Sequence, residues 1–323
     1  MKIIVLGAGK VGSNIAKNLS VQSYDICVVD KAVSKLKKLQ SEYDLAIVSG
    51  HASHPDVLKK AGIDSDTILI SVTNDDEVNI VACQIAKQIF DVKKTICRLS
   101  DSSYIKNLSA FGKEMIDIPI SPELEVTDHI IELIDHPGAE LIETFADGKV
   151  KLVSVKAKRG GKLVNRELKS IKNDIPDIDT FVPTIYRKNK AIVPDGNTVI
   201  KENDQVYFLS AEKNIDSILK EMRDQTVDSS RIMIVGGGMI GSSLASSLEN
   251  KYKVKVLETS LERCEMLSKD LNKAIVLNGD GSDEELLRSE NIENIDVFCA
   301  LTDDDETNIC LLYTSDAADE SVS

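Results

Sequence analysis

The sequence contains an internal repeat with an offset of 229 residues. The segment IIVLGAG at 3–9 matches IMIVGGG at 232–238, and polar residues farther along repeat at the same offset, for example Asn79 and Asn308. Solenoid repeats have periods of about 20–50 residues, so this spacing is too long for a solenoid. We therefore expect a domain that occurs twice, with a different module between the two copies.

Strand-like and helix-like segments alternate within the first copy. Short apolar runs occur at 3–6, 25–29, 45–48, 67–72, 95–99 and 115–120. The apolar residues of 78–89, between two of these runs, follow the i, i+3, i+4, i+7 spacing of a helix. Such alternation predicts a parallel sheet with helices on both faces. The expected fold class is α/β, with two Rossmann-like, doubly wound parallel sheets.

The correspondence between the copies shifts by one residue around the second strand. Asp30 corresponds to Glu258, an offset of 228, and one additional residue near Lys273 restores the offset of 229. Loops tolerate insertions and deletions better than strands do. Both changes are therefore expected to lie in loops.

The module between the copies has a different pattern. Strand-like segments lie at 151–158, 180–188 and 204–210, with a turn at 194–196 and a helix-like segment at about 213–223. This pattern predicts a small α+β domain, followed by the polar linker QTVDSS. The expected domains are 1–138 for the first Rossmann-like domain, 140–225 for the small domain, 231–310 for an incomplete second Rossmann-like domain and 311–323 for a tail.

The repeat ends before the chain does. Asn308-Ile309 still matches Asn79-Ile80, but the helical apolar face that follows in the first copy is lost in the second. The string CLLYTSDAADE, which begins at Cys310, resembles a translated transposon adapter from a sequencing library. We therefore expect residues 311–323 to be a non-native tail that cuts the second domain within a helix. A natural divergent tail is the alternative.

A glycine-rich loop follows the first strand of each copy. In the first copy Gly7, Gly9 and Gly12 form G-x-G-x-x-G between a strand and a helix. In a dinucleotide site these glycines permit a tight turn, close approach of the pyrophosphate and close helix–strand packing, and the helix N-terminus supplies N–H groups. A single motif of this kind is also compatible with an ordinary glycine turn. The second copy repeats the motif at Gly236, Gly238 and Gly241.

An acidic residue ends the second strand in both copies. Asp30 lies 23 residues after Gly7, and Glu258 lies 22 residues after Gly236. A carboxylate at this position can accept hydrogen bonds from the ribose hydroxyls and would repel a 2′-phosphate. The sequence therefore predicts nucleotide binding, with a preference for NAD over NADP.

Other polar residues follow the later strands. His51 lies after the third strand, and its counterpart is Asp280. Each could contact the adenosine half of a ligand, or belong to a turn that caps a helix. The acidic segment at 73–77 could contact a ligand or stabilise the start of the next helix through its dipole. Arg98, at the end of the fifth strand, could reach a phosphate or form a structural ion pair.

Composition and spacing argue against several classes of function. The chain has 39 Lys and Arg against 53 Asp and Glu, a net charge of −14, which argues against a nucleic-acid partner. No apolar run approaches the roughly 18 residues of a membrane helix, and no signal-peptide pattern precedes the first strand. The six cysteines are scattered, which argues against zinc and disulfides and fits a reducing cytoplasm. The remaining histidines show no catalytic or metal-ligand spacing, so we expect no metal site and no catalytic residue.

Motifs spread over residues 1–309 resemble those of a known family. The segments IIVLGAGKVG, CVVD, VSGHAS, SVTNDDEVN and ICRLSD resemble the TrkA family, the peripheral nucleotide-binding subunits of Trk potassium-uptake systems. The two copies resemble the N-terminal type of RCK, or KTN, regulators of potassium conductance. The segment AIVPDGNTVIKENDQVYFLS of the middle module resembles the RCK C-terminal type. The order of nucleotide domain, small domain and nucleotide domain is specific to this family among Rossmann proteins.

This resemblance implies a regulatory subunit rather than an enzyme. It implies a cytoplasmic protein, peripheral on the inner face of the plasma membrane, that gates a Trk-type potassium channel when NAD(H), ATP or ADP binds. It also implies homodimers, paired through a helix near 122–136, that assemble into a ring. The candidate cofactor-binding residues are Gly7, Gly9, Lys10, Val11, Gly12, Asp30, His51, Ala52, Thr73, Asn74 and Arg98, with Gly236, Gly238, Met239, Ile240, Gly241, Glu258, Asp280 and Thr302 in the second copy.

Two other functions remain open on the sequence alone. An NAD-dependent dehydrogenase would need an acid or base beside the nicotinamide, and residues 140–225 contain neither histidine nor cysteine. The second function that remains open is that of a nucleotide-responsive scaffold without a channel partner. Hydride transfer would identify the dehydrogenase, and co-purification with a membrane channel would exclude the scaffold.

Overall fold

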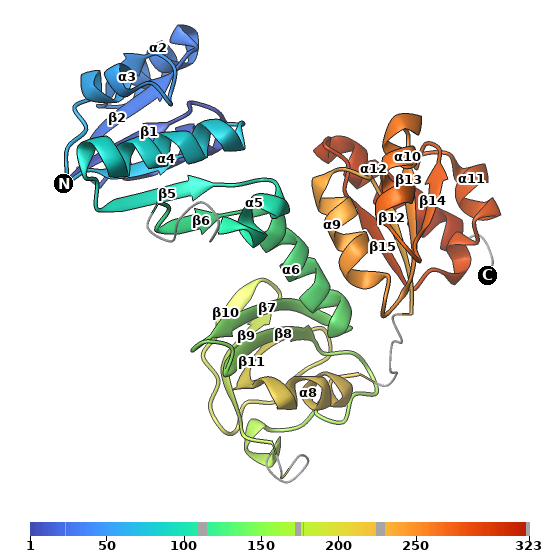
Figure 1. Cartoon of the computed structure of the whole chain (residues 1–323). Helices are drawn as coiled ribbons and strands as arrows, with labels where there is room; N and C mark the ends of the chain where they lie inside the picture. The colour runs from blue at the N-terminus through green and yellow to red at the C-terminus, as the bar shows by residue number, and fades with distance from the viewer. Residues whose placement is uncertain (23, 109–114, 172–175, 177, 224–229, 321–323) are drawn as a thin grey trace. The chain divides into compact units, whose positions relative to one another are not determined.

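A computed structural model describes residues 1–22, 24–108, 115–171, 176, 178–223 and 230–320 (Figure 1). The chain divides into two compact units, Met1–Glu125 and Val126–Ser323. The first unit holds a parallel sheet, and the second holds an antiparallel sheet and another parallel sheet. The predicted fold class is confirmed. The three-domain boundaries remain a prediction, and the expected linker at 225–230 lies, except for its last residue, outside the described residues.

The first parallel sheet has the strand order β3-β2-β1-β4-β5-β6. Its strands are β1 (Lys2–Leu6), β2 (Asp25–Asp30), β3 (Ala46–Ser49), β4 (Ile68–Ser71), β5 (Lys94–Arg98) and β6 (Ile118–Ile120). The helices of this part are α1 (Lys10–Ser20), α2 (Val33–Glu42), α3 (Pro55–Lys60), α4 (Asp76–Phe90), α5 (Ser102–Lys106) and α6 (Pro122–Asp135). Each predicted apolar run overlaps one strand. The strand order reverses between β1 and β4, as in doubly wound sheets that bind a ligand at that point.

Alternate residues of β1 face opposite sides of this sheet. Ile3 and Val5 pack with α1 and α2 in one apolar cluster, whereas Ile4 and Leu6 pack with α3 and α4 in another. All four side chains are buried. Because helices cover both faces, the strand is apolar at every central position rather than at alternate ones. This packing fixes β1 at the centre of the sheet and holds the loop after it in place.

The antiparallel sheet has the order β10-β9-β11-β8-β7. Its elements are β7 (Ala139–Phe145), β8 (Val150–Lys156), η2 (Leu168–Ser170), β9 (Thr180–Arg187), β10 (Lys190–Ile192), β11 (Gln205–Ala211), η3 (Glu212–Asn214) and α8 (Ile215–Glu221). Three strands and the helix match the predicted segments, but β7 and β10 were not predicted. Both are edge strands of the sheet, and Ile142 is the single buried residue of β7. An edge strand with little buried surface gives a weak apolar pattern.

The second parallel sheet has the order β14-β13-β12-β15, which matches β3-β2-β1-β4 of the first. Its elements are β12 (Arg231–Val235), α9 (Met239–Leu248), β13 (Lys253–Glu258), α10 (Leu261–Asp270), β14 (Ile275–Asn278), α11 (Glu284–Ser289), η4 (Ile292–Asn294), β15 (Val297–Ala300) and α12 (Asp305–Glu320). The two changes of offset lie between α9 and β13 and between α10 and β14. Both are in loops, as predicted.

The last helix, α12, continues to Glu320. The sequence predicted loss of the apolar face of this helix after Ile309, not loss of the helix. Leu311 is 1% exposed and belongs to the apolar cluster that contains Val235 and Leu287, whereas Leu312 and Tyr313 are exposed. The non-native origin of 311–323 remains a prediction.

The second half of α6 packs against the second parallel sheet. Ile130, Ile131 and Ile134 join the apolar cluster of that sheet. Asp135 accepts hydrogen bonds from the Lys251 ammonium at 2.7 Å and from the Tyr252 hydroxyl at 2.5 Å. These contacts cover part of the second half of α6, and pairing of two subunits through this helix remains a prediction.

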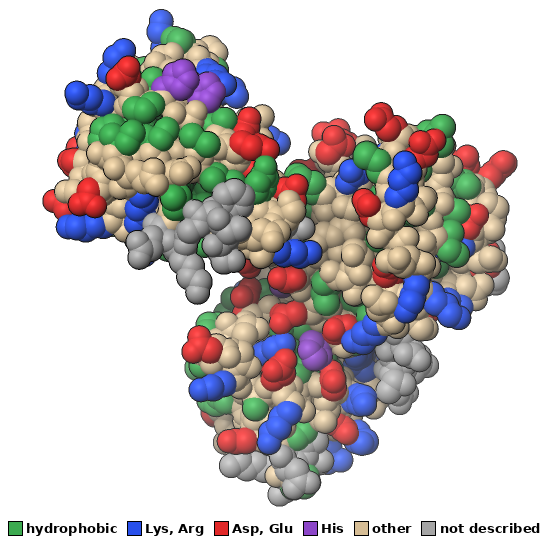
Figure 2. Space-filling view, in the orientation of Figure 1, with side chains coloured by type: hydrophobic (Ala, Val, Ile, Leu, Met, Phe, Trp, Pro, Cys, Tyr) green, Lys and Arg blue, Asp and Glu red, His purple; other side chains and the backbone are tan. Residues whose placement is uncertain are grey.

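The described helices were compared with the requirements of a membrane span and of a metal site. Within the described ranges, no helix is both long and apolar enough to cross a membrane. The same residues contain no group of three or more His, Cys, Asp or Glu side chains placed to hold a metal ion. Acidic and basic side chains are interspersed over the face shown in Figure 2.

Asp296 anchors the start of the second parallel sheet. It accepts hydrogen bonds from the main-chain N–H groups of Ser230 and Arg231, and its two oxygens bind the Arg231 guanidinium at 3.0 and 3.3 Å. The hydrogen bond from the Arg231 side chain is the largest cause that lowers the pKa of Asp296 from 3.8 to about 2.

The stability of the second sheet should therefore decrease in acid. The unfolded Asp296 carboxyl takes up its proton at a higher pH than the folded one, so its contribution is complete above about pH 4 and lost by about pH 2. We expect an Asp296→Asn variant to lose less free energy of unfolding than the wild type between these pH values. Urea unfolding followed by circular dichroism at several pH values measures how the free energy of unfolding of each protein changes with pH. The same change in the wild type and in Asp296→Asn would contradict the role assigned to Asp296.

Candidate nucleotide site

The candidate residues of the first copy lie at the carboxyl edge of its sheet. Gly7 follows β1, Asp30 ends β2, His51 follows β3, Thr73 follows β4 and Arg98 ends β5. In doubly wound sheets this edge, beside the point where the strand order reverses, is where ligands bind. The predicted residues of the second copy occupy the same edge of the second sheet, after or at the ends of β12, β13, β14 and β15.

The three glycines of the first loop have three different surroundings. Gly7 has a φ of +104°, in the region that favours glycine. A Cβ on Gly12 would lie 1.9 Å from the carbonyl oxygen of Gly7, so that no side chain fits between α1 and the loop. A Cβ on Gly9 would meet nothing within 4 Å. The open side of Gly9 is thus a surface that a ligand can approach. The second copy has equivalent surroundings. Gly236 has a φ of +107°, a Cβ on Gly241 would lie 1.9 Å from the carbonyl oxygen of Gly236, and a Cβ on Gly238 would meet nothing within 4 Å.

The first turn of α1 presents main-chain N–H groups without a competing anion. Its N-cap, Gly9, makes no side-chain hydrogen bond, and no acidic residue lies in the first turn, which includes Lys10 and Val11. The same is true of α9, which follows Gly238. Because the first N–H groups of a helix lack intrahelical partners, this end suits a phosphate.

The acidic residues that end β2 and β13 bind the glycine loops directly. Asp30 accepts hydrogen bonds from Ala8 N at 2.6 Å and from Ala32 N at 2.7 Å. Glu258 accepts them from Gly237 N at 2.7 Å and Ser260 N at 2.8 Å. Burial acts to raise the pKa of Glu258, but the hydrogen bonds from Ser260 and Gly237 outweigh it and lower the pKa. A negative charge therefore lies against each loop, where ribose hydroxyls can also reach it.

The segment at 73–77 has a structural role at the start of α4. Asp75 is the N-cap and accepts a hydrogen bond from Val78 N at 2.9 Å. Asp76 is buried and accepts hydrogen bonds from Ser100 N and Asp101 N. These carboxylates are occupied by main-chain donors. The capping interpretation is the one that this geometry favours.

Asn79 was missed as a site residue, although its repetition as Asn308 was a usable signal. It is fully buried and accepts hydrogen bonds from Ser71 Oγ, Thr73 N and Thr73 Oγ1. Its amide donates to the carbonyl oxygens of Thr73 and Arg98. Asn308 makes the equivalent bonds to Thr302. This side chain positions the loop after β4 and joins it to the end of β5.

Arg98 forms an ion pair with Glu123 in the first turn of α6. The distance from Nη2 to Oε1 is 2.5 Å, and the side chains are 20% and 15% exposed. Arg98 Nε is buried and has no hydrogen-bond partner among the described residues. The structure thus shows the ion pair, and contact of this guanidinium with a phosphate remains a prediction.

The loops after β3 and β14 are turns. His51 stacks on His54 with ring centroids 4.8 Å apart, and its Nδ1 lies 3.0 Å from Ser53 Oγ. Partial burial, followed by the charge of Lys31, lowers the pKa of His51, which favours the neutral ring. Asp280 accepts hydrogen bonds from Ser282 N and Oγ. Among the described residues, these stacking and hydrogen-bond partners of both side chains lie within three residues of them in sequence. Both residues lie at the carboxyl edge of their sheet.

Family models match most of the chain. The TrkA-N domain model matches residues 3–122 and 232–320, and the TrkA-C domain model matches residues 152–223. The two matches to one model are the two copies of the repeat.

Curated relatives resemble the chain over nearly its whole length. The "Trk system potassium uptake protein TrkA" of Halomonas elongata is 46% identical over 311 residues, which are 96% of this chain and 68% of the relative. The protein of the same name from Vibrio alginolyticus is 46% identical over 312 residues, again 96% and 68%. The one from Haemophilus influenzae is 40% identical over 312 residues, with the same shares.

Solved structures share the fold. The GsuK RCK domain superposes with a TM-score of 0.67 at 16% identity and covers 96% of this chain and 65% of that one. The GsuK channel bound to NAD gives a TM-score of 0.66 at 16% identity, with 96% and 54% covered. At this identity the likeness concerns the fold alone.

Proposed function

This chain belongs to the TrkA family, and from that premise we propose that it is a nucleotide-sensing regulatory subunit of a Trk-type potassium-uptake system. It binds NAD(H), with ATP or ADP as alternative ligands, at the carboxyl edges of its two parallel sheets, and it gates a membrane potassium channel without chemical change of the nucleotide. Relatives at 40–46% identity carry the name of a Trk system potassium uptake protein. Structures of GsuK with NAD and with ADP have the same fold.

The observation that carries this proposal is the paired geometry of the glycine loops. In both copies the second glycine is open, the third admits no side chain, and an acidic side chain accepts a hydrogen bond from the loop. These residues fit a dinucleotide. The N–H groups at the start of α1 and α9 would hold the pyrophosphate, and Asp30 and Glu258 would bind the ribose.

We propose no hydride transfer at the first site, where the carboxylates beside the loops accept hydrogen bonds from the main chain. Asp30, Asp75 and Asp76 each accept main-chain hydrogen bonds, and none is aimed as a free acid or base. A hydride-transfer enzyme needs such a group beside the nicotinamide. The nucleotide would act instead by its different affinities for two conformations of the regulator.

A location and an assembly follow from the same proposal. The chain acts in the cytoplasm, peripheral to the inner face of the plasma membrane, as a homo-oligomeric ring on its channel partner. Co-purification with a membrane potassium channel tests the partnership, and its absence would leave a nucleotide-responsive scaffold. Constant absorbance of the reduced nicotinamide in the bound complex tests the absence of turnover.

Substitution of Asp30 should weaken NADH binding. We expect Asp30→Ala to lose about tenfold or more in affinity, because charge-assisted hydrogen bonds to the ribose are each worth about 1.5–3 kcal/mol. Calorimetric titration of NADH, NADPH, ATP and ADP into the full chain measures this, with Glu258→Ala as the test of the second site.

A second variant separates ligand contact from loop stability. Asp30→Asn removes the charge that repels a 2′-phosphate, so the preference for NADH over NADPH should decrease. A purely structural role for Asp30 would lower both affinities equally. A well-folded chain that binds no nucleotide would overturn the proposed function.

A further inference from the structure

A cavity lies at the amino edge of the second parallel sheet, at the opposite end of the strands from the glycine loop. Its volume is about 730 Å³, and it is lined by the first residues of β12, β13 and β14, which are Arg231, Lys253 and Ile275. Small-molecule sites are typically clefts of about 300–1,000 Å³. Nothing in the proposed function uses this cavity.

Two of the charged groups that line the cavity are paired with acidic side chains. The Arg231 guanidinium binds Asp296, and the Lys255 ammonium lies 2.7 Å from Glu290 Oε2 and 2.8 Å from the carbonyl oxygen of the same residue. Their charges are therefore balanced within the fold.

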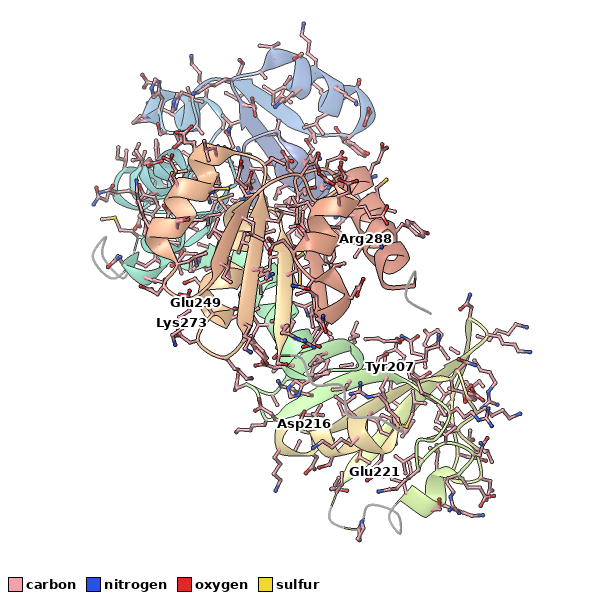
Figure 3. All side chains as sticks on the ribbon, turned by 90° about the vertical axis from the view of Figure 1, so that its right-hand side faces the viewer. Tyr207, Asp216, Glu221, Glu249, Lys273 and Arg288 are labelled. Atoms are coloured by element: carbon pink, nitrogen blue, oxygen red, sulfur yellow. The ribbon has the colours of Figure 1, made fainter. Side chains whose placement is uncertain are left out.

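Glu249 is held by the main chain rather than by a lysine. Its Oε2 accepts hydrogen bonds from the N–H groups of Asn272, Lys273 and Ala274 at 2.9, 2.7 and 3.0 Å. Figure 3 shows Glu249 and Lys273 side by side at this edge. These main-chain bonds, that of Lys273 first, lower the pKa of Glu249, which stays ionised and is 5% exposed. Its charge is thus satisfied without an ammonium group.

Two lysines remain for a ligand. Lys253 and Lys273 line the cavity, and in the part of the chain that the structure describes neither ammonium has an ion pair or a side-chain hydrogen bond. Ile275 and Ile295 line the same cavity, and Ile275 is 53% exposed. The cavity thus combines two ammonium groups that form no ion pair, with one net positive charge when Glu249 is counted, and uncovered apolar surface.

The first copy shows that the fold does not require this arrangement. In the first sheet Lys2 of β1 lies opposite Asp25 of β2, and in the second sheet Arg231 of β12 lies opposite Lys253 of β13. The first copy therefore has an acidic residue at the position of Lys253. One residue near Lys273 is added in the second copy and restores the repeat offset. The lysine at the start of β13 is therefore a feature of the second copy.

We propose that this cavity binds an organic phosphate, with its phosphate group between Lys253 and Lys273 and its apolar part against Ile275 and Ile295. Lysine ammonium groups bind phosphate as point charges. The phosphate could belong to a free ester or to the headgroup of an anionic lipid. The proposal is independent of nucleotide binding, because the two sites lie at opposite edges of the sheet.

Equilibrium dialysis of phenyl phosphate against the full chain, with NADH in excess, tests the proposal. We expect saturable binding that weakens about tenfold or more in the double variant Lys253→Glu/Lys273→Glu. The neutral variant Lys253→Met/Lys273→Met should also bind more weakly while it retains the wild-type circular dichroism spectrum. The control Lys37→Glu/Lys38→Glu makes the same charge change on the exposed face of α2 and should bind normally.

Vesicles distinguish the two sources of phosphate. The protein is sedimented with vesicles of phosphatidylglycerol and phosphatidylcholine, and with vesicles of phosphatidylcholine alone. Binding to the mixed vesicles only, and loss of this binding in Lys253→Glu/Lys273→Glu, would identify a lipid headgroup. Phenyl phosphate binding without sedimentation would identify a free ester. Equal binding of phenyl phosphate by the wild type and both double variants, or no saturable binding at all, would overturn the proposal, whether or not NADH binds.

Discussion

Gly12→Ala should strongly destabilise the first parallel sheet, whereas Gly9→Ala should leave its stability unchanged. The added methyl group at residue 12 would lie 1.9 Å from the carbonyl oxygen of Gly7, and the clash is with backbone rather than with a flexible side chain. Relief requires α1 to move away from β1, against the buried cluster that includes Ala16. We expect a loss of about 3 kcal/mol or more, at the upper end of overpacking effects.

Hydrogen exchange measured by mass spectrometry on the full chain can locate this loss. In Gly12→Ala, peptides that cover β1, β2 and β4 should exchange faster, while peptides of the second sheet provide an internal reference. Gly241→Ala should reverse the pattern, because its Cβ would also lie 1.9 Å from a glycine carbonyl, that of Gly236. Wild-type protection of β1 in Gly12→Ala would show that the loop and helix are not packed as described.

Asn79→Ala should destabilise the same sheet by about 2–4 kcal/mol. The substitution removes five hydrogen bonds and leaves the N–H of Thr73 and the carbonyl of Arg98 without this partner. A buried group left unsatisfied costs about 1–3 kcal/mol. Because the bonds join the ends of β4 and β5, the loss should appear at the carboxyl edge of the sheet, and NADH affinity should fall with it.

A matched substitution controls for the loss of an amide side chain. Asn107 is exposed, and among the described residues its side chain makes one hydrogen bond, from Nδ2 to the carbonyl oxygen of Ser103. Asn107→Ala should therefore change the unfolding free energy by less than about 0.5 kcal/mol. Urea unfolding and NADH titration of both variants test the comparison. A small effect of Asn79→Ala on both would show that the loop holds its position without it.

The parallel sheets were predictable because their strands are buried on both faces. Such strands give continuous apolar runs, as at residues 3–6. The same run recurs at the start of the second copy, which supported the prediction. The glycine loops were predictable because Gly7 and Gly236 have φ values that favour glycine, and Gly12 and Gly241 leave no room for a side chain. In contrast, β7 and β10 are edge strands with little buried surface, and periodicity does not detect them.

Side-chain partners were the part that the sequence could not provide. The alternatives for Arg98 and for residues 73–77 depended on contacts with Glu123, Ser100 and Asp101, which are 24 or 25 residues away in sequence from their partners. No spacing rule predicts such pairs. The role of Asn79 was detectable only as a repeated polar residue within an apolar helix. The cavity at the amino edge is lined by residues of several strands and loops, among them Lys273 beside the added residue, and no sequence pattern places these residues together.

The hydrogen bond from Ala8 to Asp30 constrains how cofactor preference can evolve. The same carboxylate that would discriminate against a 2′-phosphate also satisfies a main-chain amide of the glycine loop. A substitution that removes this charge must therefore also provide an acceptor for the amide, as the side-chain oxygen of asparagine can. Replacement by a residue without such an acceptor would need a compensating second change or would leave the loop less stable. The second copy, with Glu258 on Gly237, is subject to the same constraint, so a switch of the whole regulator would need it to be overcome twice.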